Sequence, residues 1–342
     1  MDSSLIWEWV IKSLVLILGL TAGFAYVTLL ERRLLAWFQV RIGPNRVGPW
    51  GLLQPVADGV KLIFKEELTP KNADKVLFTL APILTVIPAL IITAVVPWGP
   101  PVRMFGREIA LQMADLNVGV LYIMAVTSIS VYGITLAGWS SNNKYAMLGG
   151  LRATAQMISY EIALGFAMIG PVILAGSMSM NDIVEAQSKV WFVVPQFVAF
   201  VIYFISSTAE INRAPFDMPE AEQELTAGYL TEYGGMKFAV SFMAEYIKLI
   251  AISMIGSSLF LGGYQPLFGF LASVPVIGVI FTPNPLWLFL KMFAWMFVII
   301  WLRATLPRIR YDRLMMLGWK ILFPLAVANV VVTALVIILV GG

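Results

Sequence analysis

Eight apolar runs of about 20 residues constrain the fold more than any other feature of this sequence. The hydrocarbon core of a bilayer is about 30 Å thick, and a helix of about 20 residues crosses it. Because lipid offers no hydrogen-bond partners, spanning segments must be helices or closed barrels. The runs predict an all-α, polytopic membrane protein with about eight transmembrane helices, forming a single transmembrane domain over residues 1–342. The expected spans are 5–30, 76–96, 116–137, 157–174, 190–207, 238–260, 286–302 and 321–340.

The segments between these runs differ strongly in their content of Lys and Arg. One side carries 16 of these residues and the other side carries four. Since cytoplasmic loops are enriched in Lys and Arg, we expect the rich side to be cytoplasmic and both termini to lie outside. The first run lacks a basic flank and a cleavage site, which favours a retained helix. The cytoplasmic loops would be about 31–75, 138–156, 208–237 and 303–319, whereas the short apolar run 270–281 favours a loop or a partial insertion.

The sequence contains neither cysteine nor histidine. A disulfide is therefore impossible, and iron–sulfur clusters, most haem groups and most zinc sites lack their usual ligands. We expect no metal and no redox cofactor to be bound by this chain. Any proton transfer must use carboxylates or lysines whose surroundings change their affinity for protons.

Two segments on the basic side have a distinctive pattern. Residues 51–65 form an amphipathic helix, suited either to the membrane surface or to the surface of a partner. The segment 210–224 is rich in acidic residues, and Glu232 follows it. Aromatic and apolar residues such as Phe216 and Tyr229 are interleaved with these acids, which favours a loop packed into protein over a solvated one.

Beyond the first span, four charged residues fall inside the expected spans: Glu161, Glu245, Lys248 and Lys291. A charge at mid-helix costs roughly 2.5–3.5 kcal/mol on insertion scales, so such residues usually serve a polar cavity or a proton path. We favour a proton path for Glu161 and Glu245. The alternative is that Glu245 and Lys248 pair only to join helices, and Lys291 could extend to the outer interface.

Several motifs in order along the chain resemble one membrane subunit of respiratory complex I. This subunit lies next to the quinone site; it is the H subunit in bacteria and the first mitochondrially encoded subunit in animals. The matching stretches are Glu31-Arg32-Arg33, Arg41-Ile42-Gly43-Pro44-Asn45, Gly48-Pro49-Trp50-Gly51-Leu52-Leu53-Gln54, Ala57-Asp58-Gly59-Val60-Lys61-Leu62, the acidic segment 210–224 and Phe242-Met243-Ala244-Glu245-Tyr246.

The resemblance implies a subunit of a proton-translocating NADH:quinone oxidoreductase, a translocase in which quinone is the substrate. FMN and iron–sulfur clusters would be held by partner subunits, and no nucleic acid would be involved. The implied partners are peripheral-arm subunits, one with the terminal iron–sulfur cluster, then antiporter-like and small membrane-arm subunits, and membrane lipid. The implied location is a bacterial plasma membrane rather than an organelle inner membrane.

The resemblance also assigns residues to two regions. The quinone chamber and its entrance would involve Glu31, Arg32, Arg41, Asp58, Lys61, Phe216 and Asp217. The proton path would involve Glu161, Glu210, Glu220, Glu222, Glu224, Glu232, Glu245 and Lys248.

Three other functions stay open from the sequence. The same subunit could belong to a membrane-bound hydrogenase or to a dehydrogenase fed by ferredoxin or another donor. A free-standing ion transporter would use the intramembrane acids for a cation. A purely structural anchor would have no use for their ionisation.

Overall fold

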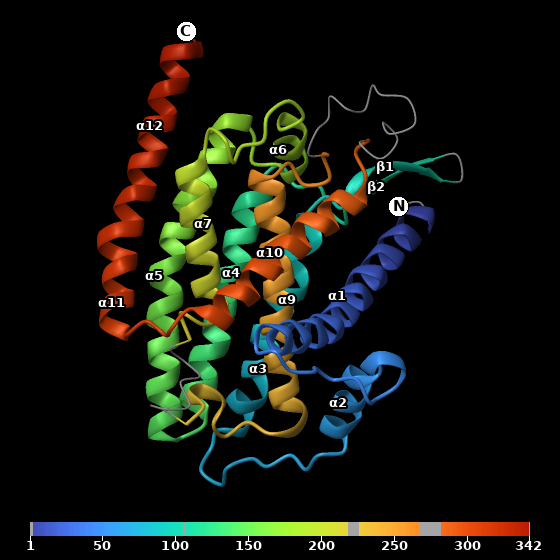
Figure 1. Ribbon diagram of the computed structural model, residues 1–342, viewed down its shortest axis with the longest axis vertical. Helices are drawn as coiled ribbons and strands as arrows, with labels where there is room; N and C mark the ends of the chain where they lie inside the picture. Colours follow the sequence, from blue (N-terminus) through green and yellow to red (C-terminus); the bar gives the residue numbers. More distant parts are fainter. Residues whose placement is uncertain (1–2, 105–106, 218–225, 267–281, 342) are drawn as a thin grey trace.

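The chain folds into a bundle of long helices (Figure 1). The computed structural model describes residues 3–104, 107–217, 226–266 and 282–341. Within these residues, seven helices are long and apolar enough to cross a membrane, and a shorter apolar helix, α7, covers Phe197–Glu210. The all-α membrane fold is thereby confirmed. The long helices are α1 (Ser3–Phe38), α3 (Lys75–Ile91), α4 (Gly119–Ser140), α5 (Lys144–Ala175), α9 (Gly235–Phe260), α10 (Pro285–Thr305) and α12 (Phe323–Gly341), which continues a short helix α11 (Tyr311–Met316) through a π-helical turn, Leu317–Leu322.

Side-chain caps fix where three of the helices begin. Asp74 accepts hydrogen bonds from the backbone N–H groups of Val76 and Leu77 at the start of α3. Asn143 and Asn284 cap α5 and α10 in the same way. A capping side chain satisfies N–H groups that have no partner within the helix and is worth about 1 kcal/mol.

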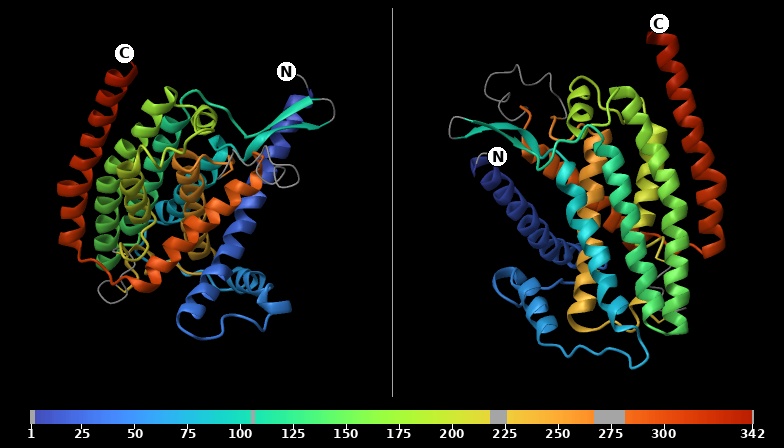
Figure 2. Two further views of the ribbon diagram at one scale, coloured as in Figure 1. Left: turned by 45° about the horizontal axis from the view of Figure 1, so that its top comes forward. Right: turned by 180° about the vertical axis from the view of Figure 1, so that it is seen from behind.

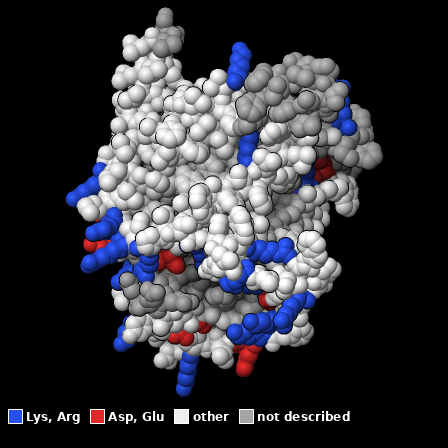
Figure 3. Space-filling view, in the orientation of Figure 1, with Lys and Arg blue, Asp and Glu red and all other residues white. Residues whose placement is uncertain are grey.

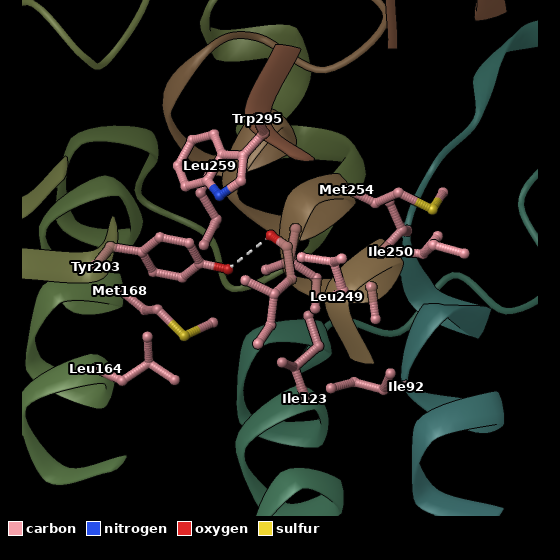
Figure 4. Close-up of a cluster of buried hydrophobic side chains, with 14 of the residues drawn as sticks. Ile92, Ile123, Leu164, Met168, Tyr203, Leu249, Ile250, Met254, Leu259 and Trp295 are labelled. Carbon is pink, nitrogen blue, oxygen red and sulfur yellow. Dashed lines mark hydrogen bonds between the residues drawn. The ribbon is translucent and has the colours of Figure 1, made fainter. Parts of the chain in front are cut away.

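Helix α9 is the central element of the bundle (Figure 2). In the most apolar 18-residue stretch of α9, 67% of the residues are buried. In the corresponding stretch of the last apolar helix, Tyr311–Leu339, 17% are buried. Figure 4 shows the core around Tyr203, whose hydroxyl donates to the carbonyl oxygen of Ile252 on α9 at 3.1 Å. Gly256 allows this close packing, because a Cβ there would lie 2.7 Å from the ring of Tyr203 and 2.8 Å from the ring of Trp295.

Helix α12 lies at the edge of the bundle and is tied to it by polar side chains. Gln196, which directly precedes α7, accepts a hydrogen bond from Asn329 Nδ2 at 2.7 Å. Its own Nε2 donates to Thr333 Oγ1, also at 2.7 Å. Hydrogen bonds of this kind between membrane helices are worth about 0.6–2 kcal/mol each.

Smaller elements lie at the two ends of the bundle. One end has an antiparallel hairpin, β1 (Gly99–Met104) and β2 (Arg107–Leu111), together with the short helix α6 (Met180–Ala186). The other end has α2 (Gln54–Ile63), which follows a 3₁₀ turn at Pro49–Gly51, and a second such turn at Gly228–Leu230. Both termini lie toward the hairpin end, away from α2 (Figure 1).

The observed helices differ in length from the expected spans. Helix α1 continues to Phe38, and α5 begins at Lys144, so most of the expected loop 138–156 is helical. Helix α7 begins at Phe197, seven residues later than the expected start at 190. The hairpin was not foreseen, and the apolar run 270–281 lies outside the described residues.

Candidate functional site

A buried ion triad joins three distant parts of the chain near the α2 end of the bundle. Glu31 of α1 is 2% exposed, and its Oε2 accepts a hydrogen bond from Arg213 Nη1 at 2.5 Å. Its Oε1 accepts another from Arg303 at the end of α10. Arg213 is 5% exposed and lies 4.1 Å from the centre of the Tyr246 ring on α9. Burial opposes the charge on Arg213, but the carboxylate of Glu31 keeps the pKa of this guanidinium above its ordinary value.

A second group of charges surrounds Lys248 in the middle of the bundle. Lys248 is buried on α9, and its Nζ donates to Ser130 Oγ on α4 at 2.7 Å. The carboxylates of Glu210, Glu245 and Glu161 all act on Lys248 electrostatically. The electrostatic surroundings of Lys248 thus include Glu210 and Glu161 as well as Glu245.

Two small cavities connect these side chains. One is lined by Glu210, Glu245 and Lys248 and the other by Glu210, Lys248 and Ser130. Each has a volume of about 10 Å³, close to the space that one water needs.

The carboxylates differ in their hydrogen bonds. Glu210 ends α7 and is 3% exposed, and its Oε2 has no hydrogen-bond partner within the described part of the chain. Glu245 accepts from the Tyr229 hydroxyl at 3.1 Å. Glu161 on α5 accepts from Ser128 and, at 3.4 Å, from Thr127, both on α4. Acids on three helices thus converge on one region.

Glu232 lies apart from this centre, at the surface. It accepts a hydrogen bond from Asn143 Nδ2 at 2.6 Å and lines an open polar pocket with Lys71 and Lys144. Next to it, Tyr233 stacks on Phe78 with ring centres 4.1 Å apart. Burial raises the pKa of Tyr233 to about 12.

The acidic loop is packed into protein where the structure describes it. Gln156 of α5 donates to the carbonyl oxygens of Ala209 and Phe216, both at 2.8 Å, and to Asn212 Oδ1 at 3.2 Å. Phe216 is buried and contacts the Tyr160 ring, with centres 5.8 Å apart. Asp217 is half-buried at the end of this stretch. Glu220, Glu222 and Glu224 lie outside the described residues.

Helix α2 presents an exposed apolar face. The side chains on it are 45–85% exposed, and they belong to Leu52, Leu53, Val56, Val60, Ile63 and Phe64. Its Asp58 accepts from Arg32 of α1 at 2.6 Å and from Gln54 at 3.0 Å. Lys61 is exposed on the same helix, and Arg41 is exposed and donates to Gln39. The structure therefore joins Arg32 to Asp58 but leaves Arg41 and Lys61 outside the buried triad.

Sequence reasoning missed several members of the site. Arg303 was counted only as a basic loop residue, and Gln156 and Tyr229 were given no role. The pair Ser128 and Ser130 was a usable signal, because two hydroxyls within an apolar run favour a polar lining. Lys291, for which extension to the outer interface was left open, is buried in the structure and donates to the carbonyl oxygens of Leu261 (2.5 Å), Gly263 (2.8 Å) and Gln265 (2.6 Å).

Comparisons with known proteins give the family of this chain. The family model for NADH dehydrogenase matches residues 11–334. This chain belongs to that family. A relative in Geobacter sulfurreducens, the H subunit 2 of NADH-quinone oxidoreductase, is 52% identical over 316 residues, which cover 92% of each chain.

Two other relatives carry the same kind of name. The H subunit of NADH-quinone oxidoreductase in Protochlamydia amoebophila is 50% identical over 310 residues, covering 91% of each chain. NADH-quinone oxidoreductase subunit 8 of Thermus thermophilus is 49% identical over 334 residues, covering 97% of this chain and 88% of the relative. The resemblance seen in the sequence motifs is thereby confirmed.

Proposed function

We propose that this chain is the membrane subunit of a proton-translocating NADH:quinone oxidoreductase, that it encloses part of the quinone chamber and that it relays protons. The names of relatives about half identical over almost the whole chain support the enzyme class. The observation that carries the relay is the series of largely buried charges from Glu31 to Glu161. It crosses from α1 through α9 and α7 to α5.

The relay works by electrostatic coupling. Reduction of a quinone to a quinol takes up two protons and builds negative charge while it proceeds. A charge change next to Glu31 and Arg213 would be felt by Glu245, which acts electrostatically on Arg213. Glu245 in turn acts on Lys248, as do Glu210 and Glu161. Each pKa unit of such coupling is worth about 1.4 kcal/mol, so shifts of a few units can move a proton against an opposing gradient.

The chamber would lie at the α2 end of the bundle. Glu31 would form its inner wall, while Arg32, Asp58, Lys61 and Arg41 would line its entrance beside the exposed apolar face of α2. Phe216 and Asp217 would anchor the acidic loop beneath it. Glu220, Glu222, Glu224 and Glu232 join the proton path in this proposal on the resemblance of their segment alone.

The distribution of surface charge supports an orientation for the bundle. Most of the Lys and Arg residues visible in Figure 3 lie in its lower half, toward α2, below a largely uncharged band. This supports a cytoplasmic α2 end, where peripheral subunits with FMN and iron–sulfur clusters would dock. Both termini would then lie outside a bacterial plasma membrane, and the antiporter-like and small membrane-arm subunits would flank the bundle.

The test is Glu245→Gln in the assembled complex, reconstituted into vesicles. We expect assembly and NADH binding to persist, but proton transport per quinol to fall at least about tenfold, because an amide cannot exchange a proton. Glu185→Gln is the matched control, since Glu185 is exposed on α6. Normal proton transport in Glu245→Gln would refute the relay.

Two further measurements separate the other functions. Copurified flavin and iron–sulfur subunits would exclude a free-standing ion transporter. Comparing NADH, reduced ferredoxin and hydrogen as donors for quinone reduction would identify the electron source. A structural anchor predicts that Glu210→Gln and Glu245→Gln both leave transport unchanged.

A further inference from the structure

An apolar cavity of about 260 Å³ lies apart from the charged site, between α1, α9 and α10. Its inner wall is formed by buried side chains, among them Leu16 and Leu20 of α1 and Ile250 and Met254 of α9. Its rim is exposed, since Val15 and Phe289 are 53% and 47% exposed. A water-sized group occupies about 30 Å³, so the cavity holds a chain segment of about eight or nine methylene-sized groups. It therefore opens on the side of the bundle, between exposed apolar side chains.

Two glycines make this space. Gly19 and Gly23 both line the cavity on α1. A Cβ at Gly19 would have no heavy atom within 4 Å, whereas one at Gly23 would lie 3.1 Å from Ile250. The space at Gly19 is thus open and is not filled by packing within the chain.

The wall of the cavity also contains a polar atom that lacks a partner. Trp98, the residue before β1, lines the cavity, and its Nε1 is buried without a hydrogen-bond partner in the part of the chain that the structure describes. Leaving a buried donor unsatisfied costs about 1–3 kcal/mol. An occupant with a carbonyl oxygen at this depth would remove that cost.

A pair of opposite charges lies on α1, one turn before Leu16 of the cavity wall. Lys12 precedes Leu16 by four residues and therefore lies one turn away on the same face of α1. Its Nζ is 2.7 Å from Glu8 Oε1. The pair offers one positive and one negative group to a headgroup that carries both charges.

We propose that this cavity binds one acyl chain of a zwitterionic phospholipid from the leaflet at the hairpin end. The ester carbonyl of that chain accepts a hydrogen bond from Trp98 Nε1, and the phosphate and amine face Lys12 and Glu8. An isoprenoid tail fits less well, because it has no oxygen to pair with the indole. The site is independent of the proposed quinone and proton functions.

The test uses the assembled complex in nanodiscs that contain phosphatidylethanolamine with a diazirine in the middle of one acyl chain. After illumination, mass spectrometry of the peptides locates the label. We expect label on residues 15–27 and 286–293 in the native complex. Gly19→Phe fills the cavity and should lower this labelling about tenfold, equivalent to about 1.4 kcal/mol of binding. Ala22→Phe, at an exposed position on the same helix, is the matched control and should not change it.

Further measurements test which molecule occupies the cavity. Trp98→Phe keeps an aromatic side chain but removes the N–H group, so labelling should fall about fivefold, as expected for one hydrogen bond. A phosphatidylglycerol probe with the same diazirine should label less. Equal labelling of Gly19→Phe and Ala22→Phe, or displacement of the label by a long-chain quinone, would overturn the proposal. If Gly19→Phe does not assemble, Trp98→Phe and the quinone competition decide it, and neither readout depends on proton transport.

Discussion

Replacing Glu31 by Gln tests how strongly the buried triad holds the bundle together. Arg213 is 5% exposed and would keep its charge without the carboxylate that now faces it. Breaking a buried ion pair by removing one partner costs about 3–5 kcal/mol, because the other charge stays in an apolar environment. Arg303 adds little to this cost, since its side chain is 40% exposed and water screens it.

The purified, detergent-solubilised complex is heated, and the loss of a peripheral subunit from it is followed by immunoblotting. We expect the transition midpoint of Glu31→Gln to fall by roughly 5–10 °C. Asp58→Asn is the control, because the Arg32–Asp58 pair is 48% and 32% exposed and should contribute less than about 1 kcal/mol. The double variant Glu31→Gln with Arg213→Met should regain much of the loss, because the only charge left without its carboxylate is the partly exposed Arg303. A midpoint for Glu31→Gln within error of that of Asp58→Asn would refute the reasoning.

Two other predictions concern helix packing. Lys291→Met removes the donor for three backbone carbonyls beyond the end of α9, so hydrogen exchange over residues 257–265 should become at least about tenfold faster; unchanged exchange would mean that the lysine does not hold this end. Gly256→Ala should destabilise the complex by about 1–3 kcal/mol in the same heating assay, because its Cβ would overlap Tyr203 and Trp295. Gly19→Ala is its neutral counterpart, and an equal loss in both variants would contradict the packing argument.

The sequence predicted the membrane helices well because the hydrocarbon core dictates both their composition and their length. The ends of the helices were harder to predict. Helix α5 begins at Lys144, where Asn143 caps it, although its first turns carry polar and charged residues and were expected to form a loop. Hydropathy alone does not distinguish a helix that extends beyond the membrane from a polar loop.

The intramembrane acids could be recognised from the sequence, because a charged residue inside a membrane span costs free energy and therefore points to a function. The residues that pair with them could not be recognised. Glu31 and Arg213 are 182 positions apart, and no local pattern brings them together. Arg303 and Glu31 are 272 positions apart. Such pairs depend on how distant helices pack together, and no short stretch of a single sequence shows this. Lys291 illustrates the same point: its position near a helix end favoured the interface, whereas packing of α10 against the end of α9 buries it.

The attachment of α12 at Gln196 has a mechanical consequence. Because lipid provides no replacement for its bonds to Asn329 and Thr333, α12 cannot slide past the start of α7 without breaking both together. These bonds tie α12 to the residue before α7, and Glu210 is the last residue of that helix. A push on α12 by a neighbouring subunit would therefore act, through the side chain of Gln196, on the helix that ends at the buried acid Glu210.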